Sequence, residues 1–467
     1  MSEALSERVP AERPRPAAEP ARARIPRVAV VLAAGRSERL AELTAGGSKA
    51  LIRVGGLSLV ERAVRTLLAS AIEHVVVVVG YQAGPVAAMV NRIAPGHVQA
   101  TFAERWEDGN GASLAAAEPY VAEEDLFLLV TMDHVFGNGA MQPLLSVGRP
   151  GVLVDHAPDP EAWAEGTRVR LHEEQAVAFS KELGDPSIDC GAFLLSRSVF
   201  AAQRQTAAHG DTSLAGAVTE LARTEPLEAI PLPRGTWWQD VDTPEDLRRA
   251  AVRLRRSLTR SSDGPVSRYL NRPISTRLSM KLAHLPLSPD AISLTAFLVA
   301  LAGAWALGAG LGVVGGLLVQ AASVLDGVDG EIARLRVRAS SAGALLDGVL
   351  DRLADGAIIA GATVWGLALN ADPELTAVLA IAATAGSMLS MATKDRIVAL
   401  GISPLPERGI GWLMGGRDAR LLIVAICGVF GAPIVALATI AATSGTSLVV
   451  RLLLARAETR GSWTGLR

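Results

Sequence analysis

The sequence lacks the features that would mark a secreted or nucleic-acid-binding protein. Among 467 residues it has two cysteines, Cys190 and Cys427. Because they lie far apart, a disulfide framework is excluded and a reducing cytosolic setting is favoured. The net charge of -2 gives no sign of a nucleic-acid partner. Residues 1–27 contain no apolar run of about 7 to 15 residues, as a cleaved signal peptide would. We therefore expect a cytoplasmic N-terminus.

The residues that are present indicate two domains joined by a basic linker. Half of the residues are hydrophobic, and the chain is long enough for more than one core. Residues 1–26 mix Pro, Ala, Arg and Glu and predict a disordered tail. Residues 27–250 alternate short β-branched runs with amphipathic stretches, which predicts an α/β domain of Rossmann-like type with a mostly parallel sheet. Residues 251–288 are rich in arginine and predict a linker followed by an amphipathic surface helix.

Apolar segments recur through residues 289–458 at about the 18 or more residues that a bilayer requires. They predict an all-α domain of six membrane helices, near 291–309, 311–332, 341–370, 374–397, 419–433 and 434–455. Arg and Lys gather after the second, fourth and sixth of these segments. This bias predicts a multi-pass protein of the cell membrane with both termini and the α/β domain in the cytoplasm. The alternative is a soluble, alanine-rich helical domain.

Four carboxylates stand in a regular pattern within the expected second and third membrane helices. Asp326 and Asp329 are spaced to share one face of a helix, as are Asp347 and Asp351. Such acids would repel one another unless cations lie between them, and oxygen ligands suit Mg2+ or Mn2+. Small residues and one arginine accompany them, and these would let a nucleotide approach and bind its phosphate: Gly330, Ala333, Gly343 and Arg334. The alternative is that the acids only pair with loop arginines.

The run Asp326-Gly-Val-Asp-Gly-Glu-Ile-Ala-Arg334, with Gly343, Asp347 and Asp351, resembles the signature of the CDP-alcohol phosphatidyltransferase family. The resemblance implies six membrane helices, a two-metal site, displacement of CMP from a CDP-alcohol, and a homodimer formed through the membrane domain. It also implies that Asp326, Asp329 and Asp347 bind metal, and that Asp351 is a second-metal ligand or the general base. Asp290 departs from the family, which often has Asn at this position.

A second set of motifs lies in the α/β region. A strand at 27–32 leads into Ala33-Ala34-Gly35-Arg36, a turn that can offer backbone N–H groups to phosphate, and basic residues follow. Later motifs stand after further predicted strands: Gly80-Tyr81, Asn110-Gly-Ala-Ser113, Asp133-His134, Asp189-Cys-Gly191 and Trp238-Gln-Asp240-Val-Asp242. Together they resemble the sugar-phosphate nucleotidyltransferase family. His134 taken alone is more often a hydrogen-bonded residue at a strand end than a ligand.

This second resemblance implies a nucleotide site. Arg36, Arg39 and Lys49 would hold the triphosphate, with Arg36 and Lys49 promoting attack on the α-phosphorus. Asp133 and Asp242 would share a Mg2+, and Lys181 would bind the sugar phosphate. The remaining nucleotide contacts would come from Ala33, Ala34, Gly35, Gly80, Asn110 and Ser113. Ser37 and Ser48 depart from the family, which has a second glycine and a proline at these positions.

The two resemblances describe consecutive reactions, because a nucleotidyltransferase with CTP makes the CDP-alcohol that the membrane domain consumes. The whole chain resembles the family of bifunctional inositol-1-phosphate cytidylyltransferases and di-myo-inositol-phosphate phosphate synthases. That family implies CTP and inositol 1-phosphate as substrates, with a second inositol 1-phosphate as acceptor. Cations for the acceptor phosphate would come from Lys394, Arg417, Arg420 and Arg451. The alternatives are a lipid acceptor or another polyol, and a membrane-anchored nucleotide sensor without turnover.

Overall fold

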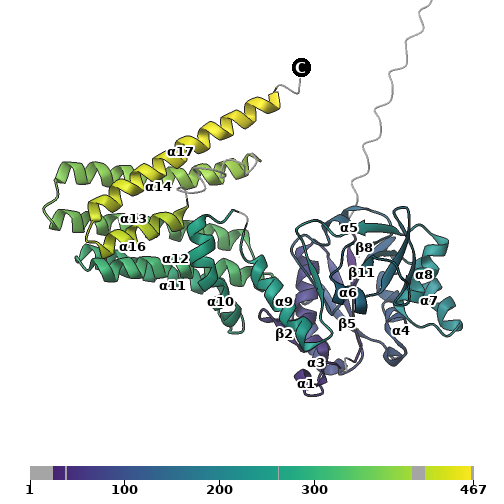
Figure 1. Ribbon diagram of the computed structural model, residues 1–467. Coiled ribbons are helices and arrows are strands. Elements are labelled where there is room, and N and C mark those ends of the chain that lie inside the picture. The colour runs from purple at the N-terminus through teal and green to yellow at the C-terminus, as the bar shows by residue number, and fades with distance from the viewer. Residues whose placement is uncertain (1–24, 37–38, 261, 402–415, 464–467) are drawn as a thin grey trace, which may run out of the picture.

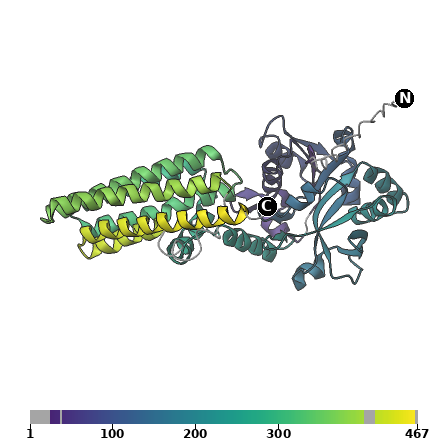
Figure 2. The same cartoon turned by 90° about the horizontal axis from the view of Figure 1, so that it is seen from above.

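The computed structural model describes residues 25–36, 39–260, 262–401 and 416–463. Residues 1–24 of the expected tail, and Ser37, lie outside the described residues. The chain forms an α/β part and a bundle of long helices, with α9 (Pro244–Ser257) and α10 (Arg272–Leu282) between them (Figure 1). Viewed from above, the long helices of the bundle run side by side, away from the α/β part (Figure 2).

A nine-stranded sheet forms the centre of the α/β part. Its strands lie in the order β5 (Val98–Phe102), β4 (His74–Val79), β1 (Val28–Ala33), β6 (Leu126–Thr131), β11 (Ile188–Ser196), β8 (Gly151–Asp155), β12 (Glu228–Pro231), β10 (Gln175–Ser180) and β9 (Arg168–His172). Strand β1 is apolar throughout, and its side chains alternate between two cores on opposite faces of the sheet. Helices therefore have to cover both faces, as the composition predicted.

The sheet is mixed, because four of its eight neighbour pairings are parallel, including β8 with β12, and four are antiparallel, so the prediction of a mostly parallel sheet is met only in part. Strands β5, β4, β1 and β6 pair in parallel, but β11 is antiparallel to both β6 and β8. Strands β9 and β10 also pair antiparallel, because only Glu173 and Glu174 separate them and a parallel pair needs a long crossover. The Rossmann-like description therefore fits only the first half of the sheet.

Short elements and helices surround this sheet. Two small two-stranded sheets pair β2 (Arg53–Val54) with β3 (Leu57–Ser58), and β7 (His134–Phe136) with β13 (Trp238–Asp240). The helices before α9 are α1 (Ala41–Thr44), α2 (Leu59–Ala69), α3 (Ala83–Val90), α4 (Asn110–Ala115), α5 (Gln142–Ser146), α6 (Pro160–Glu165), α7 (Ser198–Ala208) and α8 (Leu214–Thr224). Single 3-10 turns form η1 (Lys49–Leu51), η2 (Trp106–Asp108) and η3 (Glu118–Val121).

The bundle contains α11 (Pro289–Gly308), α12 (Gly312–Leu335), α13 (Ser341–Ala368), α14 (Pro373–Ala399), α16 (Arg417–Val429) and α17 (Pro433–Trp463). Four of these helices, α11, α12, α14 and α17, are long and apolar enough to cross a membrane. The expected count of six is not confirmed. Helix α13 carries several charged residues in its first half, and α16 spans 13 residues.

The two parts share a core. After α9, the short π-helical segment η4 (Ser267–Asn271) leads into α10. Ala283, just beyond α10, and Leu335, the last residue of α12, belong to the same buried apolar cluster as Val54 of the α/β part and Leu254 of α9. A Cβ added to Gly56 in the β2–β3 turn would lie 2.2 Å from the Ala283 carbonyl oxygen, so the two backbones are in direct contact.

Candidate functional sites

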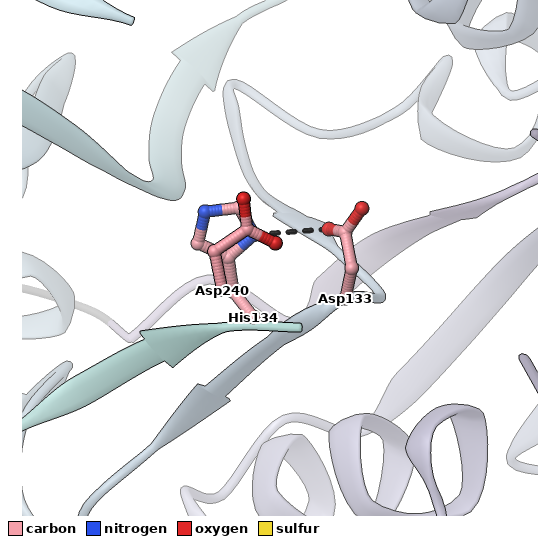
Figure 3. A group of neighbouring side chains, drawn as sticks. All are labelled: Asp133, His134 and Asp240. Atoms are coloured by element: carbon pink, nitrogen blue, oxygen red, sulfur yellow. Dashed lines mark hydrogen bonds and ion pairs between the residues drawn. The ribbon is translucent and has the colours of Figure 1, made fainter. Parts of the chain in front are cut away.

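In the α/β part, the pairing of two short strands assembles a cluster of titratable groups. Asp133 follows β6, and the antiparallel register of β7 with β13 sets His134 opposite Asp240. Figure 3 shows the side chains of these three residues close together, with His134 directed at Asp133. The His134 Nδ1 atom is 2.9 Å from Asp133 Oδ1 and 2.6 Å from Thr131 Oγ1. One ligand atom from each of the three residues lies within 4.8 Å of the others.

Lys49 lies beneath this cluster. Its side chain is buried, its ammonium group donates to Asp133 Oδ2 at 3.1 Å, and it also donates to Asp242. Burial alone would lower the pKa of Lys49, but the nearby carboxylates of Asp133, Asp240 and Asp242 hold that pKa above its usual range. Lys49 is therefore a fixed positive charge in contact with two acids. It is not the solvated surface residue that a single lysine in a sequence most often is.

The other acid and the histidine of the cluster have shifted pKa values. Burial, against an opposing effect of His134, raises the pKa of Asp240 to about 7, with further contributions from Asp133 and Asp242. Burial would lower the pKa of His134, but Asp240 and Asp133 outweigh this effect and raise it to about 9. One oxygen of Asp240, Oδ1, is buried without a hydrogen-bond partner. A buried carboxylate oxygen without a partner is suited to a cation.

A cavity of about 970 Å³ opens beside the cluster. Three residues expected from the sequence line it, Asn110, Asp133 and Lys181, together with His134 and Asp240. Gly191 also lines it, and a Cβ there would lie 2.4 Å from Thr131 Oγ1 and 2.8 Å from the His134 ring. With φ of +71° in addition, position 191 requires glycine.

The expected phosphate-binding residues lie at the ends of β1 and β4. Ala33 and Ala34 are buried, and the Ala34 carbonyl accepts the Tyr81 N–H at 2.9 Å. A Cβ on Gly80 would clash with Trp106 at 2.5 Å, and Gly35 has open space around it. The Arg36 guanidinium lies 5.5 Å above the Tyr81 ring. None of these residues is among those that line the cavity.

The other two residues expected to contact the nucleotide, Arg39 and Ser113, have different surroundings. Arg39 is exposed and pairs with Glu165 at 3.0 Å, and Glu165 lines the cavity. Ser113 is buried and donates to the Gly109 carbonyl at 3.1 Å, which ties it to the start of α4. Arg39 is therefore next to a residue that lines the cavity. Ser113 instead stabilises the backbone at the start of α4.

The sequence led us to expect that Asp133 and Asp242 share a metal ion, and it left out Asp240 and His134 as members of the cluster. The Lys49 ammonium group bridges Asp133 and Asp242. Asp242 contacts Lys49, whereas Asp240 joins Asp133 and His134. Both aspartates stand in the same motif, Trp238-Gln-Asp240-Val-Asp242, so the motif did not distinguish them. The distinguishing signal is the strand pairing of β13 with β7, which the sequence alone did not reveal.

In the bundle, α12 and α13 bring together the acids that the sequence singled out. Oxygen atoms of Asp326, Asp347 and Asp351 lie within 4.8 Å of one another. Asp329 lies deeper, where it accepts hydrogen bonds from the Ser293 hydroxyl and the Gly330 N–H. A small cavity lies between the helices, lined by Ser293 of α11, by three of the acids and by Arg417. The spacing argument therefore placed these side chains correctly.

Arginines of α16 approach the acids from one side. The Arg417 guanidinium lies 3.1 Å from Asp326, 2.8 Å from Asp351 and 2.9 Å from Asp355. Arg420 contacts the other oxygen of Asp355 at 3.3 Å, and Ser387 of α14 donates to it at 2.9 Å. Two guanidinium groups thus face five carboxylates, which leaves uncompensated negative charge. Pairing with arginines alone does not balance this site, and its oxygen-only ligands fit a hard divalent cation.

The remaining residues expected in this region differ in their positions. Arg334 donates to the Leu258 carbonyl at 3.3 Å, on the side of the linker. Gly330 has space limited by Arg334, and Gly343 donates its N–H to Ser340 at the start of α13. Ala333 is half-buried and Lys394 is exposed. Arg451 is buried and donates to Ser390 of α14. Of the four cations expected for an acceptor phosphate, Arg417 alone contacts the clustered acids among the contacts that the structure describes.

Comparison with known proteins gives two family matches. Residues 29–188 match the MobA-like NTP transferase domain, and residues 286–448 match the CDP-alcohol phosphatidyltransferase family. The first match is to a nucleotidyltransferase domain, as the motifs of the α/β part indicated. The second match covers α11 to α16 and about half of α17, including all of the clustered acids.

Two curated proteins match most of the chain, and a third matches part of it. A bifunctional IPC transferase and DIPP synthase from Rubrobacter xylanophilus is 40% identical over 91% of this chain and 95% of its own. One of the same name from Archaeoglobus fulgidus is 32% identical over 85% of this chain and 77% of its own. An archaetidylinositol phosphate synthase from Methanothermobacter thermautotrophicus is 33% identical over 34% of this chain and 72% of its own.

Proposed function

We propose, from the premise that this chain belongs to the family of bifunctional IPC transferase and DIPP synthases, that it carries out both reactions on inositol 1-phosphate. In the first reaction, CTP and inositol 1-phosphate give CDP-inositol and pyrophosphate in the α/β domain. In the second, CDP-inositol and another inositol 1-phosphate give di-myo-inositol phosphate phosphate and CMP in the bundle. The family membership supports this pairing, since the first product is the second substrate.

For the first reaction we assign the cavity beside Asp133 to the substrates. Asp133, with Asp242 and Asp240, would hold a Mg2+ or Mn2+ ion that neutralises phosphate charge and orients the attack on the α-phosphorus. Lys49, held by Asp133 and Asp242, orients these acids, and Arg36 and Arg39 would bind the triphosphate. Lys181, on the cavity wall, would bind the phosphate of inositol 1-phosphate. Backbone N–H groups around Gly35 would complete the nucleotide site.

For the second reaction we assign Asp326, Asp329, Asp347 and Asp351 to a two-metal centre. Metal ions there would stabilise the attacking and leaving oxygens of the displacement. Asp351, which lines the cavity between the helices together with Asp326 and Asp347, would take the proton of the acceptor hydroxyl. Gly330, Ala333 and Gly343 would admit the nucleotide, and Arg334 would bind its phosphate. Arg417, Arg420, Arg451 and Lys394 would attract the acceptor phosphate.

We also propose the membrane arrangement. The domains divide as residues 27–250, a linker at 251–288 and a membrane domain at 289–458. Six helices cross the cell membrane, with both sites and both termini on the cytoplasmic side, and the membrane domain forms a homodimer. The apolar character of four helices and the loop arginines support this arrangement. Charged α13 would cross because its acids face the bundle and not the lipid.

One observation favours a second acceptor. The similarity of about a third of the chain to an archaetidylinositol phosphate synthase suggests a lipid in place of the second inositol 1-phosphate. The α/β reaction would be unchanged. The two alternatives differ in where the product partitions, because a lipid product enters chloroform and a di-inositol product stays in water.

The observation that carries the proposal is the presence of two separate acid clusters, one in each domain, in a chain similar to these relatives over nearly its whole length. The test supplies the full-length protein in lipid nanodiscs with CTP, Mg2+ and a panel of polyol phosphates. We expect pyrophosphate, CDP-inositol and then di-myo-inositol phosphate phosphate by mass spectrometry, with inositol 1-phosphate preferred. Formation of a CDP-polyol other than CDP-inositol would refute the substrate assignment, but the assigned type of reaction would stand.

Substitutions assign each reaction to its site. Asp133→Ala should abolish pyrophosphate release but leave CMP release from added CDP-inositol, because the clusters lie in different domains. Asp347→Ala should do the reverse. Removal of a metal ligand should reduce the affected rate by about 100-fold or more. Unchanged CMP release in Asp347→Ala would refute the assignment of the membrane centre.

A further inference from the structure

The side of α12 that packs against α10 carries a fully buried acid that the proposed reactions do not use. Glu331 is two residues beyond Asp329, and its exposed fraction is 0%. Three groups of α10 donate to it: Arg272 Nη1 at 2.6 Å, Ser275 Oγ at 2.7 Å and Ser279 Oγ at 2.6 Å. Both oxygens of this carboxylate are therefore bound, and all of these donors come from one neighbouring helix.

Arg272 extends the contact in two directions. Its guanidinium forms a two-bond pair with Asp263, at 3.0 and 3.1 Å, and Asp263 accepts the Arg260 N–H at 2.8 Å in the linker. Its Nη1 atom also lies against Gly327 of α12, where an added Cβ would be 2.8 Å away. Gly327 stands directly after Asp326. The guanidinium thus contacts the backbone of α12 between the two acids assigned to metal.

The geometry of a helix separates Glu331 from the acids that face the cavity. At 100° per residue, Glu331 points roughly 140° away from Asp326 around α12. A carboxylate buried on that side costs free energy unless its charge and oxygens are satisfied, as they are here by Arg272 and two serines. Any rotation of α12 about its axis would break these bonds. It would also displace Asp326 and Asp329, which must be held to within about 0.5 Å for metal binding.

We propose that Glu331 and Arg272 are positioning residues that fix the rotation of α12 and thereby hold Asp326 and Asp329 at the metal centre. Through Asp263, the same pair connects this centre to the linker that leaves the α/β domain. The proposal rests on the assignment of the metal centre under the proposed function. It adds two residues that touch neither metal nor substrate and act through the backbone of the helix that carries the ligands.

The test measures metal affinity directly, by titrating the full-length protein with Mn2+ and following free Mn2+ by electron paramagnetic resonance. Asp347→Ala identifies which bound ions belong to the membrane centre, because it removes them. In Glu331→Gln we expect these ions to bind about tenfold more weakly, the size of effect typical of groups that orient metal ligands. Pyrophosphate release from CTP should be unchanged. Glu374→Gln, at an exposed acid of α14, serves as the matched control.

The readout separates positioning from general damage, because a partly unfolded sample would bind fewer ions at unchanged affinity. Ser279→Ala removes one of the three hydrogen bonds to Glu331. This variant tests the proposal if Glu331→Gln does not fold. It should weaken the same ions by a smaller factor. Wild-type Mn2+ affinity in folded Glu331→Gln, or in Ser279→Ala where Glu331→Gln does not fold, would overturn the proposal. If instead Asp347→Ala kept all of its Mn2+, the assignment of the metal centre itself would fail.

Discussion

His134 has three close neighbours on its own side of the cluster. Its Nδ1 atom lies between Asp133 and Thr131, and its ring stacks on Trp238 at a centroid distance of 5.3 Å and an interplanar angle of 7°. The negative charges of Asp240 and Asp189 also favour the protonated form of His134. In the absence of metal, His134 is thus a cation at neutral pH, which partly offsets the acids around it. A divalent cation bound to Asp133 and Asp240 would compete with the proton of His134 for the same negative charges.

We expect His134 to titrate near pH 9 in the presence of a chelator, because its carboxylate neighbours outweigh its burial. The proton is held more tightly in the folded chain, so its contribution to stability is present below about pH 6.5 and is lost as the pH rises through about 9. Mg2+ should lower the midpoint. The measurement is NMR of the histidine Cε1–H groups, assigned with His134→Gln. A midpoint near 6.5 without metal would contradict this account.

For single residues, the sequence predicted some positions better than others. Asp326, Asp329, Asp347 and Asp351 were located correctly, because their spacing on single helices determines the face that they share. Asp240 was missed, because its neighbours depend on the pairing of two three-residue strands more than 100 residues apart. Short-range periodicity carries no information about such a long-range register.

Among the elements, the packing of α11 against α13 depends on small residues. Gly361 of α13 faces Ala304 of α11, and a Cβ added at Gly361 would lie 2.2 Å from the Ala304 carbonyl oxygen. The helices are therefore in backbone contact, as small residues permit in membrane bundles. Helix α13 carries Asp347 and Asp351, so its distance from α11 affects the shape of the acid site.

Gly361→Ala should force α11 and α13 apart, because the contacted atom belongs to backbone and cannot move aside. Overpacking of this kind costs about 1–3 kcal/mol. We expect lower CMP release and a lower melting temperature of the bundle, with pyrophosphate release unaffected. Gly356→Ala is the control on the same helix, since nothing lies within 4 Å of its added Cβ. Equal losses in both variants would show that the contact with Ala304 is not responsible.

The long helices were predictable, and the sheet was only partly so. Apolar segments and the small-residue and acid pattern located α11 to α14 to within a few residues, because a membrane requires long uninterrupted helices. The parallel strands β1, β4 and β6 were also predicted from their apolar runs. The antiparallel position of β11 was not, because a run buried on both faces reads alike in either direction.

For the whole molecule, the decisive feature is that the two parts are joined by packing as well as by the chain. Leu335 ends the helix that carries Asp326 and lies buried near Leu254 of α9 and Gly55 of the β2–β3 turn. The same turn follows Lys49 by only a few residues. Arg336 closes the contact by donating to the Ala283 carbonyl at 3.0 Å. The composition predicted two domains, but no sequence pattern indicated this shared core.

Leu335→Ala tests whether that core holds the molecule together. Leu335 is 1% exposed, so truncation should leave a cavity and cost about 2–5 kcal/mol. Because the lost contacts belong to the α/β core, we expect the unfolding transition of that domain to move to lower temperature, although the substitution is in a bundle helix. Calorimetry in detergent measures the shift, and Leu298→Ala, at a 55% exposed position of α11, is the control. If the α/β transition were unchanged, the domains would move independently, joined by the linker alone.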